Sequence, residues 1–402
     1  MNDTVNPPLA DELPASAPTF PRRLNIRFTG SGSEYFRIWA VNLLLIFITI
    51  GLYLPFAKAR RIRYFYANTL VDGQALSFHG DTWKMFRGFI LLVVLMAVYS
   101  GAGRFSPYAG VAAFIVLCAV WPALWRASMQ FRLANTGWRG LRMHFAGTLK
   151  DAYLAVAPLY VPLVAFVTMS FEVQRSAGDT DADKAAQAAL AIWIFAPMAV
   201  VALATPWFWA LTKRYQHNGY RIANQHSRIA LPTWRLYLLG LKGVLIGMVP
   251  AVLAGVALAG IVGALGASGV LGSASGKAWR FVIGIASGVL FYLFLFVLIG
   301  PYFASRIQNM VWGATRSESI SFVSQLRFRS LFWLTLKNWT LVALTLSLYR
   351  PFAMVNTARL RLEAVSLNFY GSVEALVAQA DAGNQDATGE IAGDFFGIDM
   401  GL

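Results

Sequence analysis

Four histidines are the side chains best suited to acid–base or metal chemistry. They lie in the polar connections between apolar segments, at His79, His144, His217 and His226. Imidazole is the commonest metal ligand and titrates near neutral pH. His79 directly follows a phenylalanine, whereas His144 directly precedes one. Their positions relative to this phenylalanine therefore do not place the two histidines on the same face of a strand. We interpret the histidines as hydrogen-bonding residues at an interface and expect no bound metal or cofactor.

The sequence lacks the motifs that mark common catalytic sites. It contains no G-x-x-x-x-G-K-[ST] phosphate loop, no H-E-x-x-H zinc motif and no pair of cysteines, because Cys118 is the single cysteine. Ser, His and Asp do not combine into a nucleophile motif. We therefore predict that the protein is not an enzyme.

The chain around these residues is mostly apolar, and this composition limits which elements it can form. Apolar residues make up 57% of the 402 residues and charged residues 13%, about half the charged fraction of a soluble domain. This composition predicts a membrane protein. The net charge is +15, and the basic residues lie beside apolar segments. We therefore expect a bilayer with anionic headgroups as the partner, and no nucleic acid.

Eight apolar runs are long enough to cross a bilayer core, which needs about 20 helical residues. They are roughly 35–56, 86–103, 107–125, 152–171, 188–211, 236–265, 280–304 and 331–350. The expected fold class is all-α membrane: a polytopic helical bundle of six to eight membrane segments. Lys and Arg concentrate in the four longer connections, which should face the cytoplasm. The predicted location is the bacterial inner (cytoplasmic) membrane, with several passes.

A pattern recurs along the chain. Each apolar segment that enters a basic connection ends in proline, at Pro55, Pro122, Pro206, Pro301 and Pro351. Ala-Asn-Thr or a related triplet follows at a fixed offset, and then Phe-x-Gly. We predict a membrane domain over 24–375, between a disordered tail at 1–23 and a flexible acidic tail at 376–402. Its five repeated modules are 24–78, 78–145, 145–229, 229–322 and 322–371.

Short stretches of period-two alternation follow the basic helical pieces. They include 24–28, 75–78, 141–145 and 365–369, and they predict short β elements at the cytoplasmic face. A lone two-stranded hairpin is marginally stable, so we expect these strands to pair with each other. If all of them lie on one side, 35–56 and 331–350 must dip into the membrane and return. Spanning by both segments remains the alternative.

Polar and basic residues supply two sets of candidate site residues. The segments 35–56 and 331–350 align without a gap and carry candidate pore or packing residues at Asn42, Thr49, Asn338 and Thr345. The candidate contacts with lipid headgroups are Lys58, Arg61, Arg126, Arg132, Lys213, Arg214 and Arg306. No Asp or Glu lies inside a predicted segment, which weakens the case for a proton-coupled carrier.

The opening of the chain resembles the YjgN-like family of bacterial inner-membrane proteins, which is built on a domain of unknown function. The residues that carry the resemblance are FTGSGSEYFRIWAVNLLLIFITIGLYLPFAKARRIRYFYANT, followed by FHG. The resemblance covers about residues 24 to 375. It implies a polytopic inner-membrane protein, and it implies no chemistry, catalytic residue or ligand.

Two functions from different classes follow from the sequence. The first is a transporter or channel for an unidentified small solute, because transporters often arise from repeats with broken helices. The second is a non-catalytic membrane-organising or lipid-interacting protein, because basic and aromatic residues gather at the membrane interface. A water-filled cavity lined by Asn42 and Asn338 would favour the first. A solid core with clustered arginines at headgroup level would favour the second.

Overall fold

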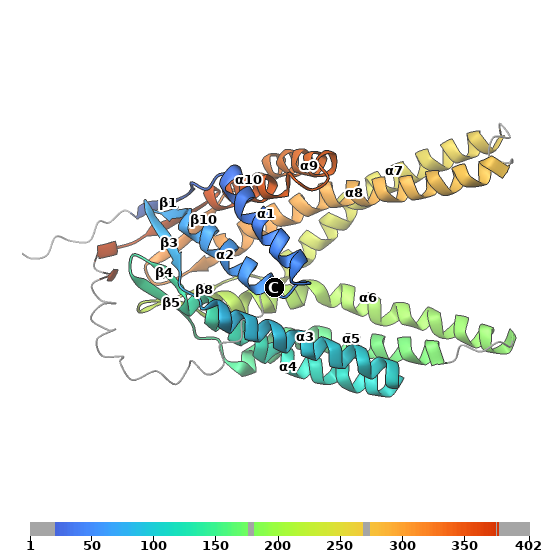
Figure 1. Cartoon of the computed structure of the whole chain (residues 1–402), viewed down its shortest axis with the longest axis horizontal. Helices are drawn as coiled ribbons and strands as arrows, with labels where there is room; N and C mark the ends of the chain where they lie inside the picture. The colour runs from blue at the N-terminus through green and yellow to red at the C-terminus, as the bar shows by residue number, and fades with distance from the viewer. Residues whose placement is uncertain (1–20, 176–180, 268–273, 375, 378–402) are drawn as a thin grey trace, which may run out of the picture.

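The computed structural model describes residues 21–175, 181–267, 274–374 and 376–377, and the predicted terminal tails lie almost entirely outside them. Within these residues, helices leave a β-sheet and run back to it in pairs (Figure 1). The pairs are α1 (Gly32–Ile48) with α2 (Leu54–Ala67), α3 (Thr82–Phe105) with α4 (Pro107–Ala134), α5 (Leu149–Arg175) with α6 (Asp181–Asn218), α7 (Thr233–Ala267) with α8 (Ala274–Gly313), and α9 (Phe328–Leu344) with α10 (Arg350–Glu363). We call α2, α4, α6, α8 and α10 the returning helices.

The strands are short, and in the described residues they join into one antiparallel sheet of eleven. The order across the sheet is β7-β6-β5-β4-β3-β2-β1-β11-β10-β9-β8. The strands are β1 (Arg22–Phe28), β2 (Thr69–Val71), β3 (Gln74–Phe78), β4 (Thr136–Trp138), β5 (Leu141–Phe145), β6 (Tyr220–Ile222), β7 (Gln225–His226), β8 (Arg228–Ile229), β9 (Thr315–Arg316), β10 (Ile320–Ser324) and β11 (Val365–Phe369). The predicted pairing of the short strands with each other is confirmed.

The sheet curls until its two ends nearly meet. Its outermost strands, β7 and β8, are separated in the chain by Ser227 alone, whose N–H donates to the carbonyl oxygen of Tyr220 at 3.0 Å. Strands as far apart in the order as β5 and β10 contribute to one apolar core. The buried residues of that core are Leu24, Val71, Trp138, Leu141, Ile320, Phe369, Val373 and Leu376. The curled sheet therefore encloses packed apolar side chains, including two from the segment after β11.

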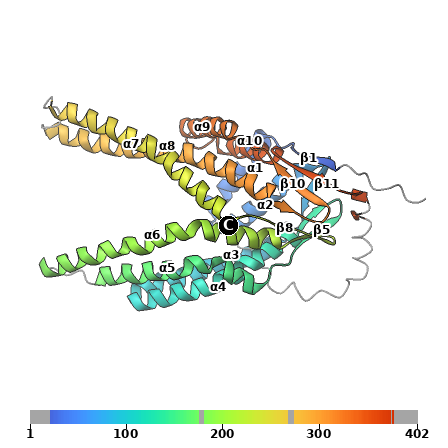
Figure 2. The ribbon, with the colours of Figure 1, turned by 180° about the vertical axis from the view of Figure 1, so that it is seen from behind.

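The helix pairs differ in length. The three central pairs extend far from the sheet, whereas α1–α2 and α9–α10 stay close to it (Figures 1 and 2). Among the described residues, three helices are long and apolar enough to cross a membrane: Thr82–Phe105, Pro107–Ala134 and Thr233–Ile261. A bent pair, Leu149–Tyr160 with Pro162–Ser170, would make a fourth. The apolar side chains that these helices expose, such as Val94, Val116 and Leu253, are suited to contact with lipid.

The predicted all-α bundle of six to eight membrane segments is wrong. An 11-stranded sheet organises the chain, and the described residues hold three or four candidate spans. The error has a physical cause, because apolar length alone does not distinguish one crossing helix from a helix that turns back. Residues 35–56 and 331–350 are helix–turn–helix segments that leave the sheet and return to it. Each of the two segments thus turns back toward the sheet.

The turns of these two segments are built alike. Each has two consecutive residues with positive φ: Ile50 and Gly51 in one, Leu346 and Ser347 in the other. The Thr49 hydroxyl donates to the Leu45 carbonyl oxygen and accepts from the backbone N–H of Tyr53, at 2.7 and 3.0 Å. Thr345 makes the same two bonds in the other segment, at 2.6 and 3.0 Å. These two candidate pore or packing residues therefore satisfy backbone groups of the turns.

Candidate anion-binding site

Donor side chains on the returning helices hold the five segments that lead from a strand into an outgoing helix. Each donates to the carbonyl oxygen of the second residue after a strand, at 2.7 to 3.0 Å. The donor and acceptor residues are Arg63 with Gly80, Arg126 with Gly147, Arg214 with Leu231, Asn309 with Leu326 and Arg359 with Gly30. Two predicted headgroup contacts, Arg126 and Arg214, are thus placed in internal hydrogen bonds.

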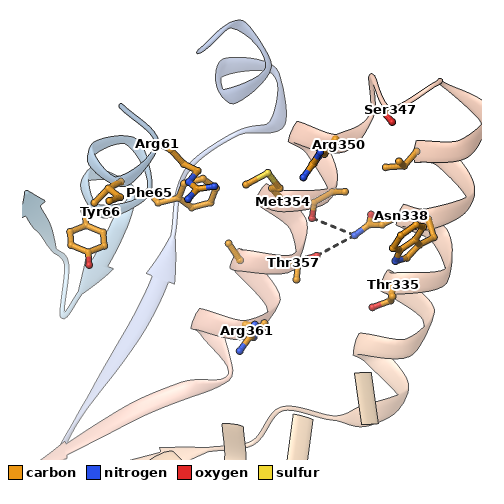
Figure 3. Close-up of a pocket in the computed structure, with 15 residues that line it drawn as sticks. Arg61, Phe65, Tyr66, Thr335, Asn338, Ser347, Arg350, Met354, Thr357 and Arg361 are labelled. Atoms are coloured by element: carbon orange, nitrogen blue, oxygen red, sulfur yellow. Dashed lines mark hydrogen bonds between the residues drawn. The ribbon is translucent and has the colours of Figure 1, made fainter. Parts of the chain in front are cut away.

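A cavity with a volume of about 850 Å³ lies between α2, α9 and α10 (Figure 3). Three arginines line it: Arg61 from α2 and both Arg350 and Arg361 from α10. Most of the remaining wall is apolar or aromatic, as at Phe65 and Trp339. The cavity therefore combines guanidinium groups with an apolar surface.

A second cavity of about 590 Å³ adjoins the first, because both are lined by Arg61, Arg350 and Met354. Its other walls come from α1, α2 and α3 and include Lys58 and Trp39. The two arginines stand at the junction of two largely apolar spaces, each within the usual size range of ligand pockets.

The positive charges at this junction act on the pKa of Tyr35. Burial raises the pKa of Tyr35, while the positive charges of Arg61 and Arg350 act in the opposite direction. Its side chain is 3% exposed and packs on Phe28 and Val355. The two guanidinium groups therefore lie within electrostatic range of one buried hydroxyl, although they come from helices far apart in the sequence.

The predicted polar residues Asn42 and Asn338 are buried beside the two cavities. Asn42 lines the smaller cavity and Asn338 the larger. The Asn338 amide nitrogen donates to the Ala353 carbonyl oxygen at 3.4 Å and to the Thr357 hydroxyl at 3.2 Å, which ties α9 to α10 (Figure 3). The structure therefore places one asparagine beside each space, and Asn338 also serves helix packing.

The arginines of the junction have no acidic partner in the described part of the chain. The ion pairs recorded there join Arg22 and Arg139 to Asp72 and Glu374, at the sheet. Both side chains are solvent-exposed, Arg61 on α2 and Arg350 at the start of α10. Arg61 and Arg350 are therefore available to an anion that enters the cavities.

The other predicted headgroup contacts are separated from this junction. Arg132 and Lys213 line a third cavity, of about 320 Å³, between α4, α5 and α6. Arg306 is exposed on α8. Sequence reasoning missed Arg350 and Arg361. A signal for Arg361 was present, because it stands ten residues after Pro351, as Arg132 does after Pro122.

The histidines do not assemble. His217 is buried, its Nδ1 lies 2.9 Å from the Thr315 hydroxyl, and burial lowers its pKa to about 4, helped by the charge of Lys213. His79 contacts the Ser77 hydroxyl at 3.1 Å. In the described residues, no group of three or more His, Cys, Asp or Glu side chains is arranged to hold a metal ion.

Fold and site together define a class: a helical membrane protein whose helix pairs stand on a curled sheet, with a cationic cavity between them. The chain belongs to the family described as "Bacterial protein of unknown function (DUF898)", which matches residues 23–395. No solved structure matches the chain.

Curated relatives carry the printed name "Inner membrane protein YjgN". The chain is 27% identical over 145 residues to the protein from Salmonella typhimurium, covering 35% of this chain and 37% of the relative. It is 27% identical over 143 residues to the protein from Escherichia coli O157:H7, covering 35% of each. The matched part thus spans about a third of these relatives. Their names and the family match support an inner-membrane location.

Proposed function

We infer that the protein is a non-catalytic, multi-pass inner-membrane protein that binds an anionic phospholipid at Arg61 and Arg350. The observation that carries this function is the junction of two largely apolar cavities at two arginines without an acidic partner in the described residues. Guanidinium groups match phosphate oxygens in charge and geometry. The apolar walls suit acyl chains, which a small hydrophilic solute lacks.

The packed interior of the curled sheet supports lipid binding over conduction. A channel along the axis of the helices would have to pass the apolar core that includes Trp138, Leu141 and Phe369. Val373 and Leu376 add to this core from the C-terminal side. Transport of a solute stays a separate hypothesis, and flux through reconstituted protein with solute panels tests it.

We also propose which side of the membrane the sheet faces. All the long basic connections lead into strands of the one sheet, and basic connections favour the cytoplasmic side. We place the sheet there, with the longer helix pairs crossing the membrane and α1–α2 and α9–α10 re-entering it. We also propose that the five segments of the chain are repeated modules, each contributing a returning helix and the strands after it.

Native mass spectrometry of the purified full-length protein tests the lipid site. With equal amounts of phosphatidylglycerol and phosphatidylcholine added, we expect preferential retention of phosphatidylglycerol. Hydrogen bonds to charged groups contribute about 1.5–3 kcal/mol each, so Arg61→Gln with Arg350→Gln should weaken retention by at least about a hundredfold.

The matched control is Arg27→Gln, which removes an exposed cation from β1 that lines neither cavity. It should leave retention of phosphatidylglycerol unchanged. Equal retention of the two lipids by the unmodified protein, or unchanged retention by the double variant, would contradict the proposed function.

A further inference from the structure

Basic side chains line the outer face of the curled sheet. In β1, alternation turns Leu24 into the apolar core and leaves Arg23 and Arg27 exposed on the opposite face. In β5, Leu141 lies in the same core and Arg142 is exposed. The pleat of the strands therefore separates an apolar interior from a cationic exterior.

Most of these cations follow one row across the strands. Residues paired in register lie directly opposite each other, so their side chains share a face of the sheet. From β5 through β8 to β1, the paired residues are His144, Arg221, His226, Arg228, Arg316, Ser321, Asn368 and Arg23. His226 and Arg228 end the two outermost strands and are separated by Ser227 alone, so the row continues where the ends of the sheet nearly meet.

We call the six arginines and two histidines of this outer face the basic band, and all eight side chains are exposed. Its members are Arg23, Arg27, Arg142, His144, Arg221, His226, Arg228 and Arg316.

The basic band has almost no acidic counterpart in the described part of the chain. The strands themselves contain no Asp or Glu. The recorded ion pairs use Asp72 and Glu374 with other arginines, and Glu318 is a single exposed acid in the turn after β9. Arg228 stands directly opposite Arg316, and like charges in that position destabilise a sheet. An anionic partner on the band would remove this cost.

The complementary charge is present in the C-terminal segment of the same chain. Residues 378–402 carry five of the 19 acidic residues and no Lys or Arg. The five acids are Asp381, Asp386, Glu390, Asp394 and Asp399. The segment begins just after Leu376, which is buried in the core of the sheet. It is therefore tethered at the sheet, and a tether of this kind raises the effective concentration of a ligand to about the millimolar range.

The segment is long enough to reach the whole band. When extended, 25 residues span up to roughly 80 Å. The row crosses eight strands and is about 35 Å wide, because neighbouring strands lie about 4.8 Å apart. Reach therefore does not limit contact between the acidic segment and the cations.

A bilayer surface fits the basic band less well than a tethered segment does. The helices leave the sheet in one direction (Figures 1 and 2), so a membrane that they cross lies beyond the helix end of the sheet. The band instead lies on the flank of the sheet and curves with it, since the outermost strands nearly meet. A flat surface can contact only one side of such a band, whereas a chain can follow its curve.

We propose that the acidic C-terminal segment, residues 378–402, docks on the basic band of its own chain. The carboxylates neutralise the opposed arginines and cover them against other polyanions. The band lines neither cavity of the lipid junction, so the docking goes beyond the proposed function and stands without it.

A distance measurement between two spin labels in the full-length protein tests the docking. One label is placed on β1 by Asn25→Cys, and the other in the acidic segment by Ala392→Cys, after Cys118→Ala removes the single cysteine. In phosphatidylcholine nanodiscs at about 0.1 M NaCl, we expect one narrow distance population. At about 1 M NaCl the Debye length falls to about 3 Å, and the distribution should become at least twice as wide.

Variants of the band assign the contact to its cations. Arg221→Gln, Arg228→Gln and Arg316→Gln together should give the wide distribution already at low salt. The matched control removes three exposed cations from the helices and should leave the distribution narrow: Arg60→Gln, Arg104→Gln and Arg306→Gln. Thermal unfolding checks that both triple variants are folded.

A charge exchange separates docking from a general effect on folding. Arg228→Glu with Arg316→Glu should widen the distance distribution. Adding Glu390→Lys and Asp394→Lys to that variant should make the distribution narrow again, because opposite charges then face each other once more.

Several results would overturn the docking. A distribution with the same width at both salt concentrations, or one unchanged in the folded triple variant of the band, would refute it. Loss of the narrow population on dilution with unlabelled protein would assign the band to a second copy, and loss on adding phosphatidylglycerol would assign it to the membrane. A narrow, salt-sensitive population for Ala10→Cys in place of Ala392→Cys would assign it to the N-terminal segment. None of these variants changes Arg61 or Arg350, so the docking and the lipid junction fail separately.

Discussion

Replacing Gly80 with alanine should destabilise the fold by overpacking the core beneath β3. A Cβ at Gly80 would lie 2.4 Å from Cζ and 2.6 Å from Cε1 of the Phe78 ring. The ring cannot easily move away, because Phe78 is 7% exposed and packs with Ala59, Met85 and Phe131. Overpacking of this kind costs about 1–3 kcal/mol. We expect about 2 kcal/mol, or roughly a thirtyfold shift in the unfolding equilibrium.

Chemical unfolding in detergent micelles, followed by tryptophan fluorescence, measures this cost. Gly101→Ala in α3 is the matched control, because a Cβ there meets nothing within 4 Å, and alanine is favoured over glycine in a helix. Gly101→Ala should therefore be neutral or stabilising.

A double variant tests the contact itself. Phe78→Leu replaces the ring with a smaller aliphatic group, so Gly80→Ala should cost less in that background than in the unmodified protein. The reasoning is refuted if Gly80→Ala is no more destabilising than Gly101→Ala, or if its cost is the same with and without the ring of Phe78.

Two further outcomes follow from the structure. His217 has its pKa lowered to about 4 from 6.5, so the unfolded chain binds a proton that the native protein does not. The free energy of unfolding should therefore fall as pH decreases from about 6.5 to 4, by up to about 3 kcal/mol. In thermal unfolding, His217→Asn should show a weaker dependence of stability on pH. An equally steep dependence in the variant would contradict the role of His217. Thr345→Val removes the hydroxyl that accepts from the Tyr349 N–H and should lower the free energy of chemical unfolding by about 1 kcal/mol. The control Thr340→Val loses one hydrogen bond at an exposed helix position and should cost less. Equal costs would refute the role of the Thr345 hydroxyl in the turn.

Local structure was predictable where one residue pattern decides it. Alternation located strands at 24–28, 141–145 and 365–369, and the structure has β1, β5 and β11 there. The Phe-x-Gly pattern also has a local cause. The ring of Phe145 folds back over Gly147, where a Cβ would lie 2.6 Å from the ring. A side chain at that position would displace the phenylalanine, so glycine is required.

The extent of the sheet was not predictable in the same way. Each strand has two to seven residues, and some strands pair with distant segments, hundreds of residues away in the pairing of β1 with β11. Alternation within such a short stretch predicts which side chains share a face, but it does not predict which other strand pairs with that stretch. Pairing between the two ends of the chain turns separate hairpins into one curled sheet.

Several residues that line the cationic cavities occur at one fixed offset in the sequence, and only the fold shows that this offset leads to a cavity. Phe65, Arg132, Gln216 and Arg361 each stand ten residues after the proline of a returning helix, and each lines one of the cavities. These helices all end twelve residues after that proline, so a fixed offset from it lies on a corresponding side of each helix end. When such helices lie side by side, residues from distant segments line the same cavity, as Phe65 and Arg361 do. Arginine at this offset in two helices, with Lys213 three residues earlier in a third, therefore places cations in two cavities that no single segment would indicate.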